Sequence, residues 1–330
     1  MEALDRSGWD EERVGGLRGP TSGRGMLPPA AAPFFRAERL HGGDDLDAGF
    51  SVLVATEGDG TLLRDAVAGD PEGFLGAEHV ARFGTDTALL VKLLDAGQRL
   101  PVHFHPSRAF AREHLGREHG KTEAWLIFEA EPGARVHVGF AEPVSLETVR
   151  GWMRAQDSEA MLRAMRELPV GPGDVVYVPA GTPHAIGAGI LMVEIQEPTD
   201  LSVLLEWDGF DLTEDGAHLD LGWDVALEAL DRSGWDEERV GGLRGPTSGR
   251  GMLPPAAGPF FRAERLHGGD DLDAGFSVLV ATEGDGTLVT EGGGEQPLRR
   301  GEALLLPYAA GAGRLEGTVG AIRCRPPEAT

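Results

Sequence analysis

Apolar residues occur in short runs between Gly, Asp and Pro turns over most of the chain after residue 87. Runs of about four to eight apolar or alternating residues between turn residues are typical of β-strands. In the first half we predict strands at residues 88–94, from 100 onward, and at 122–129, 135–140, 175–178, 188–196 and 202–207. Residues 145–168 are amphipathic and predict two helices, with Ser145 and either Asp157 or Ser158 as N-caps.

The second half shows the same pattern, which indicates a second β domain. The strands predicted there are residues 260–266, 275–281, 286–290, 296–306, 313–317 and 319–325. Short helices are predicted at 62–71, 78–83 and 225–231, and residues 241–259 form a connector rich in Gly and Pro. The chain is therefore predicted to be mainly β, with domains at 63–222 and 223–330 and a small helical insertion at 145–168.

The sequence contains an internal repeat, since residues 1–62 correspond to 227–288 and, from residue 2 on, differ only at Ala32 against Gly258. Packing alone does not require such identity, because surface loops tolerate substitution. We predict that the second copy builds the C-terminal domain and that the first acts as substitute N-terminal strands. Residues 34–40 and 49–55 should then pair with the metal-binding domain, and residues 1–30 should remain poorly packed. The alternative is exchange, in which the first copy enters the C-terminal sheet and displaces the second copy.

Three histidines and one glutamate are the most informative side chains of the sequence. His103 and His105 are separated by one residue on a predicted strand, so their side chains lie on the same face. Glu123 begins a later strand and shares a face with Trp125, which turns its carboxylate inward. An inward carboxylate needs a metal ion or another cation to offset the cost of burial.

The turn before His184 explains how this histidine reaches the others. Gly173 and Asp174 turn the chain, residues 175–178 form a buried strand, and residues 179–181 (Pro-Ala-Gly) form a tight turn. Imidazole and carboxylate ligands suit Zn, Fe, Mn or Ni, and the ligand set does not choose among them. The sequence thus predicts one divalent metal ion bound by four side chains, which are His103, His105, Glu123 and His184.

The H-x-H motif and the later G-x5-P-x-G-x2-H motif resemble the signature of metal-binding cupins, which are small antiparallel β-barrels. Four segments are similar to type I mannose-6-phosphate isomerases in their short bacterial form: LPVHFHP from residue 100, GKTEAW from 120, VPAGTPHAIGAG from 178 and EIQ from 194. The resemblance covers residues 63–330. It implies two cupin (antiparallel β-barrel or jelly-roll) domains, Zn2+ in the first, and interconversion of mannose 6-phosphate and fructose 6-phosphate through an ene-diol.

Further side chains near the predicted metal ion are candidates for catalysis and substrate binding. Lys121 shares the face of Glu123 and resembles an active-site lysine of the family, with a solvated strand end as the alternative. Glu194, on the strand after His184, is a second acid–base candidate, with a structural carboxylate as the alternative. Arg108 and Arg112 are candidates for phosphate binding, because Arg forms bidentate contacts with phosphate, and a solvated helix is the alternative.

Two departures from the family pattern bear on the substrate. His103 stands where the family has Gln, and metal binding should survive because imidazole is the stronger ligand. Residues 200–207 (DLSVLLEW) contain no Arg, although the family carries an Arg there that binds or polarises the substrate. Two further interpretations therefore stay open, a non-catalytic sugar-binding or regulatory cupin and an isomerase of a non-phosphorylated sugar. An iron cupin dioxygenase is compatible with H-x-H, but the other motifs oppose it.

Charge and cysteine content narrow the partners and the compartment. A net charge of −24 disfavours nucleic acid and anionic membranes, which both need a positive surface. Cys324 is the only cysteine, which excludes an intrachain disulfide and is typical of a reducing compartment. No apolar run approaches the roughly 20 residues of a membrane span, and the N-terminus lacks the pattern of a secretory signal. We expect a cytoplasmic monomer or homodimer that acts on a small sugar phosphate.

Overall fold

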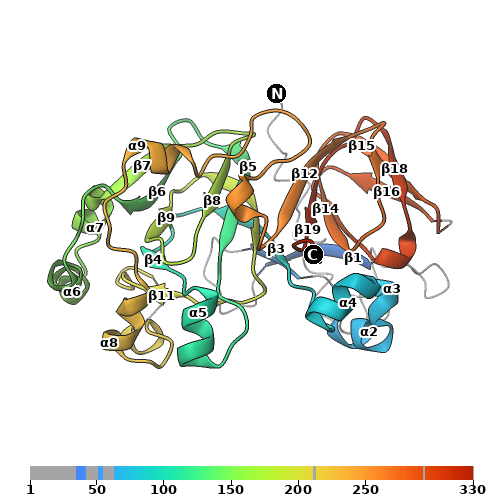
Figure 1. Ribbon diagram of the computed structural model, residues 1–330. Coiled ribbons are helices and arrows are strands. Elements are labelled where there is room, and N and C mark those ends of the chain that lie inside the picture. Colours follow the sequence, from blue (N-terminus) through green and yellow to red (C-terminus); the bar gives the residue numbers. More distant parts are fainter. Residues whose placement is uncertain (1–34, 42–50, 55–62, 211–212, 293, 330) are drawn as a thin grey trace. The chain divides into compact units, whose positions relative to one another are not determined.

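The computed structural model describes residues 35–41, 51–54, 63–210, 213–292 and 294–329 (Figure 1). These residues divide into two compact units. The metal-site unit comprises residues 94–245, and the C-terminal unit comprises residues 246–329 together with 63–93 and strands β1 (Phe35–His41) and β2 (Ser51–Val54).

The metal-site unit contains two β-sheets, apart from residues 90–93 at the start of one strand, and the strand pairs described in them are antiparallel. The first has the strand order β3 (Leu90–Ala96), β10 (Ile190–Gln196), β5 (Glu123–Ala130), β8 (Val175–Val178). The second has the order β11 (Val203–Leu204), β4 (His103–Phe104), β9 (His184–Ile186), β6 (Arg135–Phe140), β7 (Met165–Pro169). Every residue of β8 and β10 is buried, which explains why these strands appear as continuous apolar runs in the sequence.

Some predicted elements differ in length from the observed ones. Residues 202–207 were expected to form one strand, but only Val203–Leu204 pairs with β4, because the following amides of Leu205 and Glu206 bond to the carbonyl of Val102. The polar segment after His105 contains α5 (Arg108–Phe110) and one π-helical turn, η3 (Ala111–Leu115).

The helical insertion begins where the sequence predicts. In α6 (Leu146–Ala155) the Ser145 hydroxyl accepts a hydrogen bond from the Thr148 amide at 3.0 Å. In α7 (Ser158–Ala164) the cap is Asp157, whose carboxylate accepts from the Ala160 amide at 3.0 Å. The insertion is shorter than predicted, since Met165–Pro169 forms β7 along β6. None of the described helices is long and apolar enough to cross a membrane.

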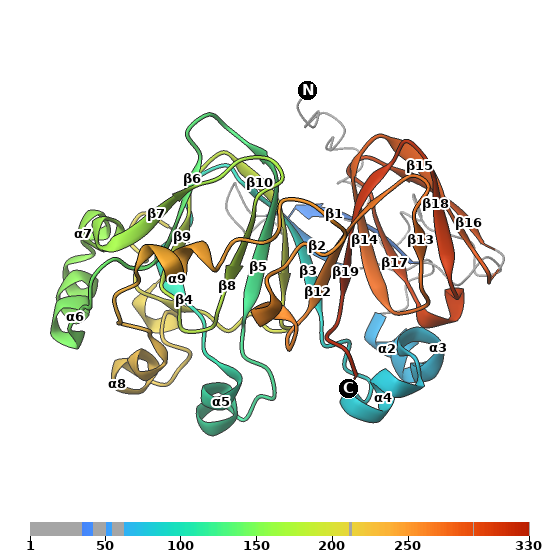
Figure 2. The same cartoon turned by 45° about the horizontal axis from the view of Figure 1, so that its top comes forward.

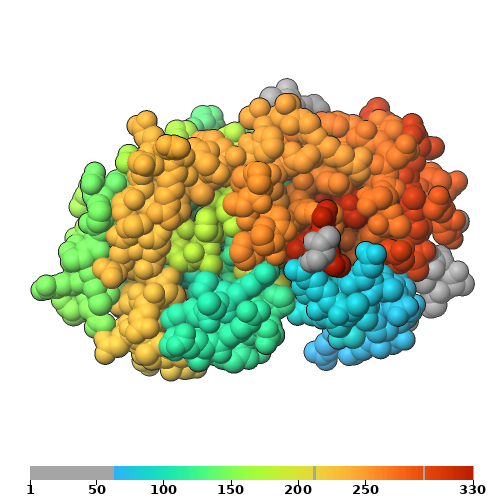
Figure 3. Space-filling model, viewed as in Figure 1, coloured from blue at the N-terminus to red at the C-terminus, as the bar shows by residue number. Residues whose placement is uncertain are grey.

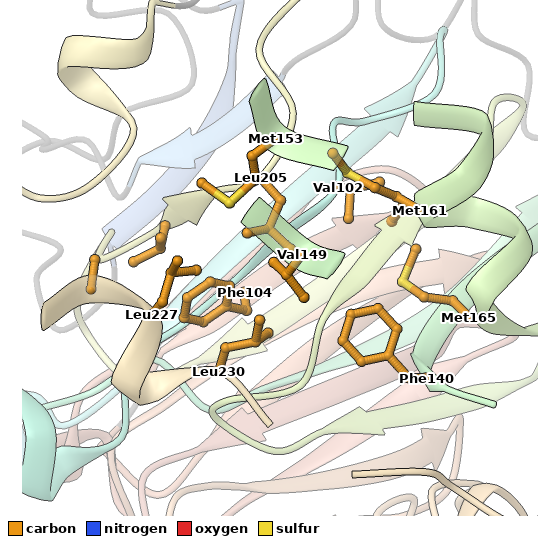
Figure 4. Packing of buried hydrophobic residues seen from close by; sticks show 13 residues of the cluster. Val102, Phe104, Phe140, Val149, Met153, Met161, Met165, Leu205, Leu227 and Leu230 are labelled. Atoms are coloured by element: carbon orange, nitrogen blue, oxygen red, sulfur yellow. The ribbon is translucent and has the colours of Figure 1, made fainter. Parts of the chain in front are cut away.

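One apolar core joins the insertion to the sheet of His103 (Figure 4). Val149 and Met153 of α6 belong to the same buried cluster as Phe104 and Phe140. The cluster also contains Leu227 and Leu230, which come from the turn η5 (Leu227–Ala229) after α8 (Trp223–Ala226) and from the residue that follows it. This packing explains why the metal-site unit continues to Gly245, beyond the predicted boundary at residue 222.

The C-terminal unit also consists of two sheets, built from eight strands of its own sequence with β1 and β2 (Figure 2). The strands are β12 (Arg262–His267), β13 (Asp271–Leu272), β14 (Ser277–Glu283), β15 (Asp285–Thr290), β16 (Glu295–Arg299), β17 (Ala303–Leu306), β18 (Gly313–Gly317) and β19 (Gly320–Arg325). The helices and turns of the two units not yet described are α2 (Leu63–Gly69), α3 (Pro71–Leu75), α4 (Ala77–Phe83), η4 (Glu214–Gly216), α9 (Glu237–Gly241), η6 (Pro255–Ala257) and η7 (Tyr308–Ala310). The apolar core of this unit is formed by buried Leu, Ala and Val side chains.

The first copy of the repeat joins the C-terminal sheet. The order of the six-stranded sheet is β12-β19-β14-β17-β1-β2, and β1 pairs antiparallel with β17. The prediction that residues 34–40 and 49–55 pair with the metal-binding domain is therefore wrong. Exchange does not occur either, because β12 and β14 of the second copy keep their places beside β19. The free edge of β17 accounts for this arrangement, since an unpaired strand edge readily accepts another strand. Residues 1–30 lie outside the described residues.

A glycine in β6 provides a stability test of this fold. Gly139 has a φ of +63°, and a Cβ atom there would lie 2.4 Å from the ring of Trp235, which is fully buried. We expect Gly139→Ala to lower the free energy of unfolding by about 2 kcal/mol or more, because backbone strain and overpacking add. Urea unfolding measures this change. Gly151→Ala is the matched control: its Cβ would meet no atom within 4 Å in α6, and it should raise the stability by about 0.5–1 kcal/mol.

Candidate metal centre

Neighbouring strands bring the three predicted histidines together. His103 on β4 lies directly opposite His184 on β9, and His105 follows two residues after His103. The Nε2 atoms of His103 and His184 are 3.0 Å apart, and one ring nitrogen from each of the three histidines lies within 4.8 Å of the others. The predicted turn delivers His184, with Gly181 at a φ of +86° and its amide 2.7 Å from the His105 carbonyl.

Hydrogen bonds to the backbone fix the orientation of all three rings. The Nδ1 atoms of His103, His105 and His184 lie 2.8, 2.9 and 2.8 Å from the carbonyl oxygens of Pro101, Leu201 and Thr182, respectively. Carbonyl oxygens only accept hydrogen bonds, so each Nδ1 carries the hydrogen and each Nε2 keeps its lone pair. This is the arrangement in which protein histidines bind metal ions, with the second nitrogen held by an outer partner.

The rings are neutral at physiological pH. Burial lowers the pKa of His105 and of His184 to about 3 and, with the neighbouring His184, holds the pKa of His103 well below its usual value. A histidine must be neutral to bind a metal ion. The three side chains therefore need no deprotonation before binding.

Glu123 lies beside two of the histidines and is completely buried. Its carboxylate oxygens are 3.1 Å from the Nε2 of His105 and 3.4 Å from the Nε2 of His184. Trp125 donates its indole N–H to the same carboxylate at 3.0 Å, a contact that orients it. Burial would raise the pKa of Glu123, but Lys121 and His105 hold it well below the usual range, so the group is an anion.

Lys121 and Glu194 lie next to this cluster, and both are buried. The Lys121 ammonium donates to Glu123 and is 2.7 Å from the Nε2 of His105. It is also 3.9 Å from a carboxylate oxygen of Glu194. The prediction that Lys121 shares the face of Glu123 agrees with this geometry.

The donor set fits a divalent cation. The three neutral Nε2 atoms converge beside the anionic carboxylate of Glu123, so their lone pairs can all be directed at one cation. Nitrogen and carboxylate ligands of this kind suit Zn and its transition-metal neighbours. Within the part of the chain that the structure describes, this is the only group of three or more His, Cys, Asp or Glu side chains whose ligand atoms converge in this way.

The two candidate phosphate-binding arginines are each paired with a carboxylate. Arg108 on α5 donates its Nε–H to Glu197, and its side chain is 27% exposed. The Arg112 Nε is 3.0 Å from Glu118, and both of these side chains are exposed. The part of the chain that contains α5 lies on the molecular surface, where it is coloured teal in Figure 3. A substrate in solution can therefore approach this segment.

Sequence analysis missed Glu197. This residue follows β10 directly, is fully buried, and receives hydrogen bonds from the Thr122 amide and from Arg108. Its position directly after an apolar strand could have indicated its role. A carboxylate at such a position is buried only where hydrogen-bond or charge partners offset the cost of burial.

The sequence was compared with protein-family models and with known proteins. No model of a known protein family matches the chain. The chain is 36% identical over 191 residues to mannose-6-phosphate isomerase of Streptococcus mutans, a match that covers 52% of this chain and 59% of that protein. It is 32% identical over 240 residues to mannose-6-phosphate isomerase ManA of Bacillus subtilis, covering 69% of this chain and 72% of that protein.

A solved structure supports the fold. The crystal structure of mannose 6-phosphate isomerase from Bacillus subtilis superposes with a TM-score of 0.64 at 24% identity, covering 85% of this chain and 87% of that one. Together with the antiparallel sheets, this confirms the predicted mainly β, cupin-type fold.

Proposed function

Since the chain belongs to the mannose-6-phosphate isomerase family, we propose that it interconverts mannose 6-phosphate and fructose 6-phosphate at the candidate metal centre. The observation that carries this proposal is the convergence of three Nε2 atoms beside two buried acid–base groups, Lys121 and Glu194. An aldose–ketose isomerase needs both parts, because a proton must move between two adjacent carbons while negative charge develops on the sugar oxygens.

We propose that His103, His105, His184 and Glu123 bind one Zn2+ ion. Their chemistry supports zinc, and Fe, Mn or Ni would use the same atoms. When bound, the ion supplies Lewis-acid polarisation of a sugar oxygen. The four side chains are fixed by the carbonyl contacts of the histidines and by the indole N–H of Trp125.

Lys121 and Glu194 are proposed to move the proton. Their charged groups are 3.9 Å apart, so both can reach neighbouring atoms of one sugar. Lys121 also faces the carboxylate of Glu123, which keeps its ammonium directed at the cluster. Burial of both side chains excludes bulk water from the proton transfer.

Arg108 remains our first candidate for the phosphate group of the substrate, and Arg112 is the second. Arg108 is partly exposed and lies on the segment that follows His105. A bound phosphate would share its guanidinium with Glu197. We also propose a cytoplasmic protein with a small sugar phosphate as its substrate, in agreement with a single, buried cysteine.

Removal of metal tests the proposed function directly. We expect the purified protein to form fructose 6-phosphate from mannose 6-phosphate in a coupled assay, and to lose this activity after dialysis against a chelator. Zn2+ alone should restore it. Mannose without phosphate, assayed in parallel, should react far more slowly. Activity that survives complete metal removal, or equal turnover of the two sugars, would contradict the proposal.

A further inference from the structure

Glu197 is a buried carboxylate outside the candidate ligand set that contacts several segments of the active site. One oxygen accepts a hydrogen bond from the Thr122 amide at 2.9 Å, and the other accepts from Arg108 and lies 3.8 Å from the Nδ1 of His119. The Glu197 amide also donates to the Thr122 carbonyl at 3.1 Å. Thr122 is thus held at both its backbone groups by one residue.

These contacts lie on both sides of Lys121. Thr122 follows the lysine directly, and the amide of Lys121 itself donates to the Pro106 carbonyl at 3.0 Å. On the other side the Thr199 hydroxyl donates to the Gly120 carbonyl at 2.5 Å. The backbone around Lys121 is therefore fixed to the segment that follows Glu194 and to the segment that follows His105.

The charge of Glu197 is maintained despite its burial. Burial raises the pKa of this carboxyl, but the nearby His119 ring and the hydrogen bonds from Thr122 and Arg108 outweigh it, and the pKa lies below its ordinary value. A buried ion pair is costly to form and contributes little to stability compared with apolar packing. Stability alone is thus a weak reason for a carboxylate at this position.

We propose that Glu197 is a positioning residue for the isomerisation, because its carboxylate fixes the backbone of Thr122 and thereby places the Nζ atom of Lys121 beside the candidate metal centre. This inference rests on the proposed function. The Lys121 side chain starts one residue from the fixed amide, and its ammonium lies next to His105 and Glu123. A displacement of about 1 Å at an acid–base group can reduce the rate by about 10²-fold.

A double-mutant cycle of Glu197→Gln and Lys121→Ala tests the inference. Glu197→Gln should lower kcat by about 10- to 100-fold with unchanged metal content and little change of KM. In the Lys121→Ala background the same substitution should cost less than about 2-fold, because effects that act through one group are not additive. Equal losses in both backgrounds, or no loss in either, would overturn the proposal. Glu167→Gln, which removes an exposed ion pair with Arg135, is the control and should change nothing.

A second measurement does not depend on activity. The chain has only two lysines, Lys92 and Lys121, so labelling with lysine that carries 13C only at Cε gives two side-chain NMR signals that Lys92→Arg assigns. Glu197→Gln should shift the Lys121 signal and leave the Lys92 signal in place, and an unmoved Lys121 signal would refute the proposal even in a protein without isomerase activity. If Glu197→Gln does not fold, Glu197→Asp keeps the charge but shortens the reach, and it must show the same pattern in both experiments. A wild-type protein inactive on mannose 6-phosphate contradicts only the proposed function.

Discussion

His184→Ala is expected to abolish both metal binding and isomerase activity. His184 is completely buried, and its Nε2 lies close to the Nε2 of His103 and to the carboxylate of Glu123. Its Nδ1 is hydrogen-bonded to the Thr182 carbonyl. Alanine removes one of the three converging nitrogens. Among the described residues, no fourth histidine belongs to this group and could replace it. Loss of metal assistance should lower kcat/KM by about 10³-fold or more, which corresponds to about 4 kcal/mol of transition-state stabilisation.

Metal analysis and the coupled assay measure both consequences in one preparation. His267→Ala is a suitable control, because this histidine is exposed on β12 and belongs to the other unit. It should retain metal and activity. If His184→Ala protein still bound one equivalent of zinc with wild-type affinity, the assignment of this side chain as a ligand would be wrong.

Lys121→Ala should produce a different pattern, in which activity falls and metal is retained. The ammonium contacts Glu123 and His105 without belonging to the nitrogen cluster, and a bound metal ion would repel it. Its removal should therefore leave metal affinity unchanged or raise it. We expect kcat to fall by about 10²-fold or more, the usual contribution of a general acid–base group.

The other lysine of the chain provides the matched comparison for this variant. Lys92 lies on β3 and is partly exposed. Lys92→Ala should leave kcat and KM as in the wild type. A normal kcat in Lys121→Ala would remove this residue from the mechanism, and a loss of bound metal would show that its role is to hold Glu123 in place.

Local sequence predicts many of the strands of this protein and the convergence of its three histidines, for physical reasons. The buried strand at Val175–Val178 and the turn through Gly181 place His184 by themselves, because a strand and a tight turn depend on nearby residues. His103 and His105 share a face by the two-residue period of a strand. The caps at Ser145 and Asp157 are equally local.

The contacts between distant segments could not be predicted in the same way. Glu197 gains its importance from Arg108 and Thr122, which lie 89 and 75 positions away in the chain. Leu227 and Leu230 belong to the same buried cluster as Phe104, so the metal-site unit extends beyond the predicted boundary at residue 222. The sequence around these two residues does not show which domain they pack against. Strand order is likewise set by pairings across the sheet, and residues 34–40 carry no local mark that favours β17.

The repeat means that two identical strand sequences occur in one sheet, so the stability of each β-bridge does not decide which copy lies beside β19. The segments that follow the two copies are different. The second copy continues from β14 into β15 and β16 of the same unit, whereas residue 62, the last of the first copy, is followed by α2 (Leu63–Gly69). The order of the strands in this sheet is therefore specified outside the duplicated residues, by the unique sequence that follows each copy.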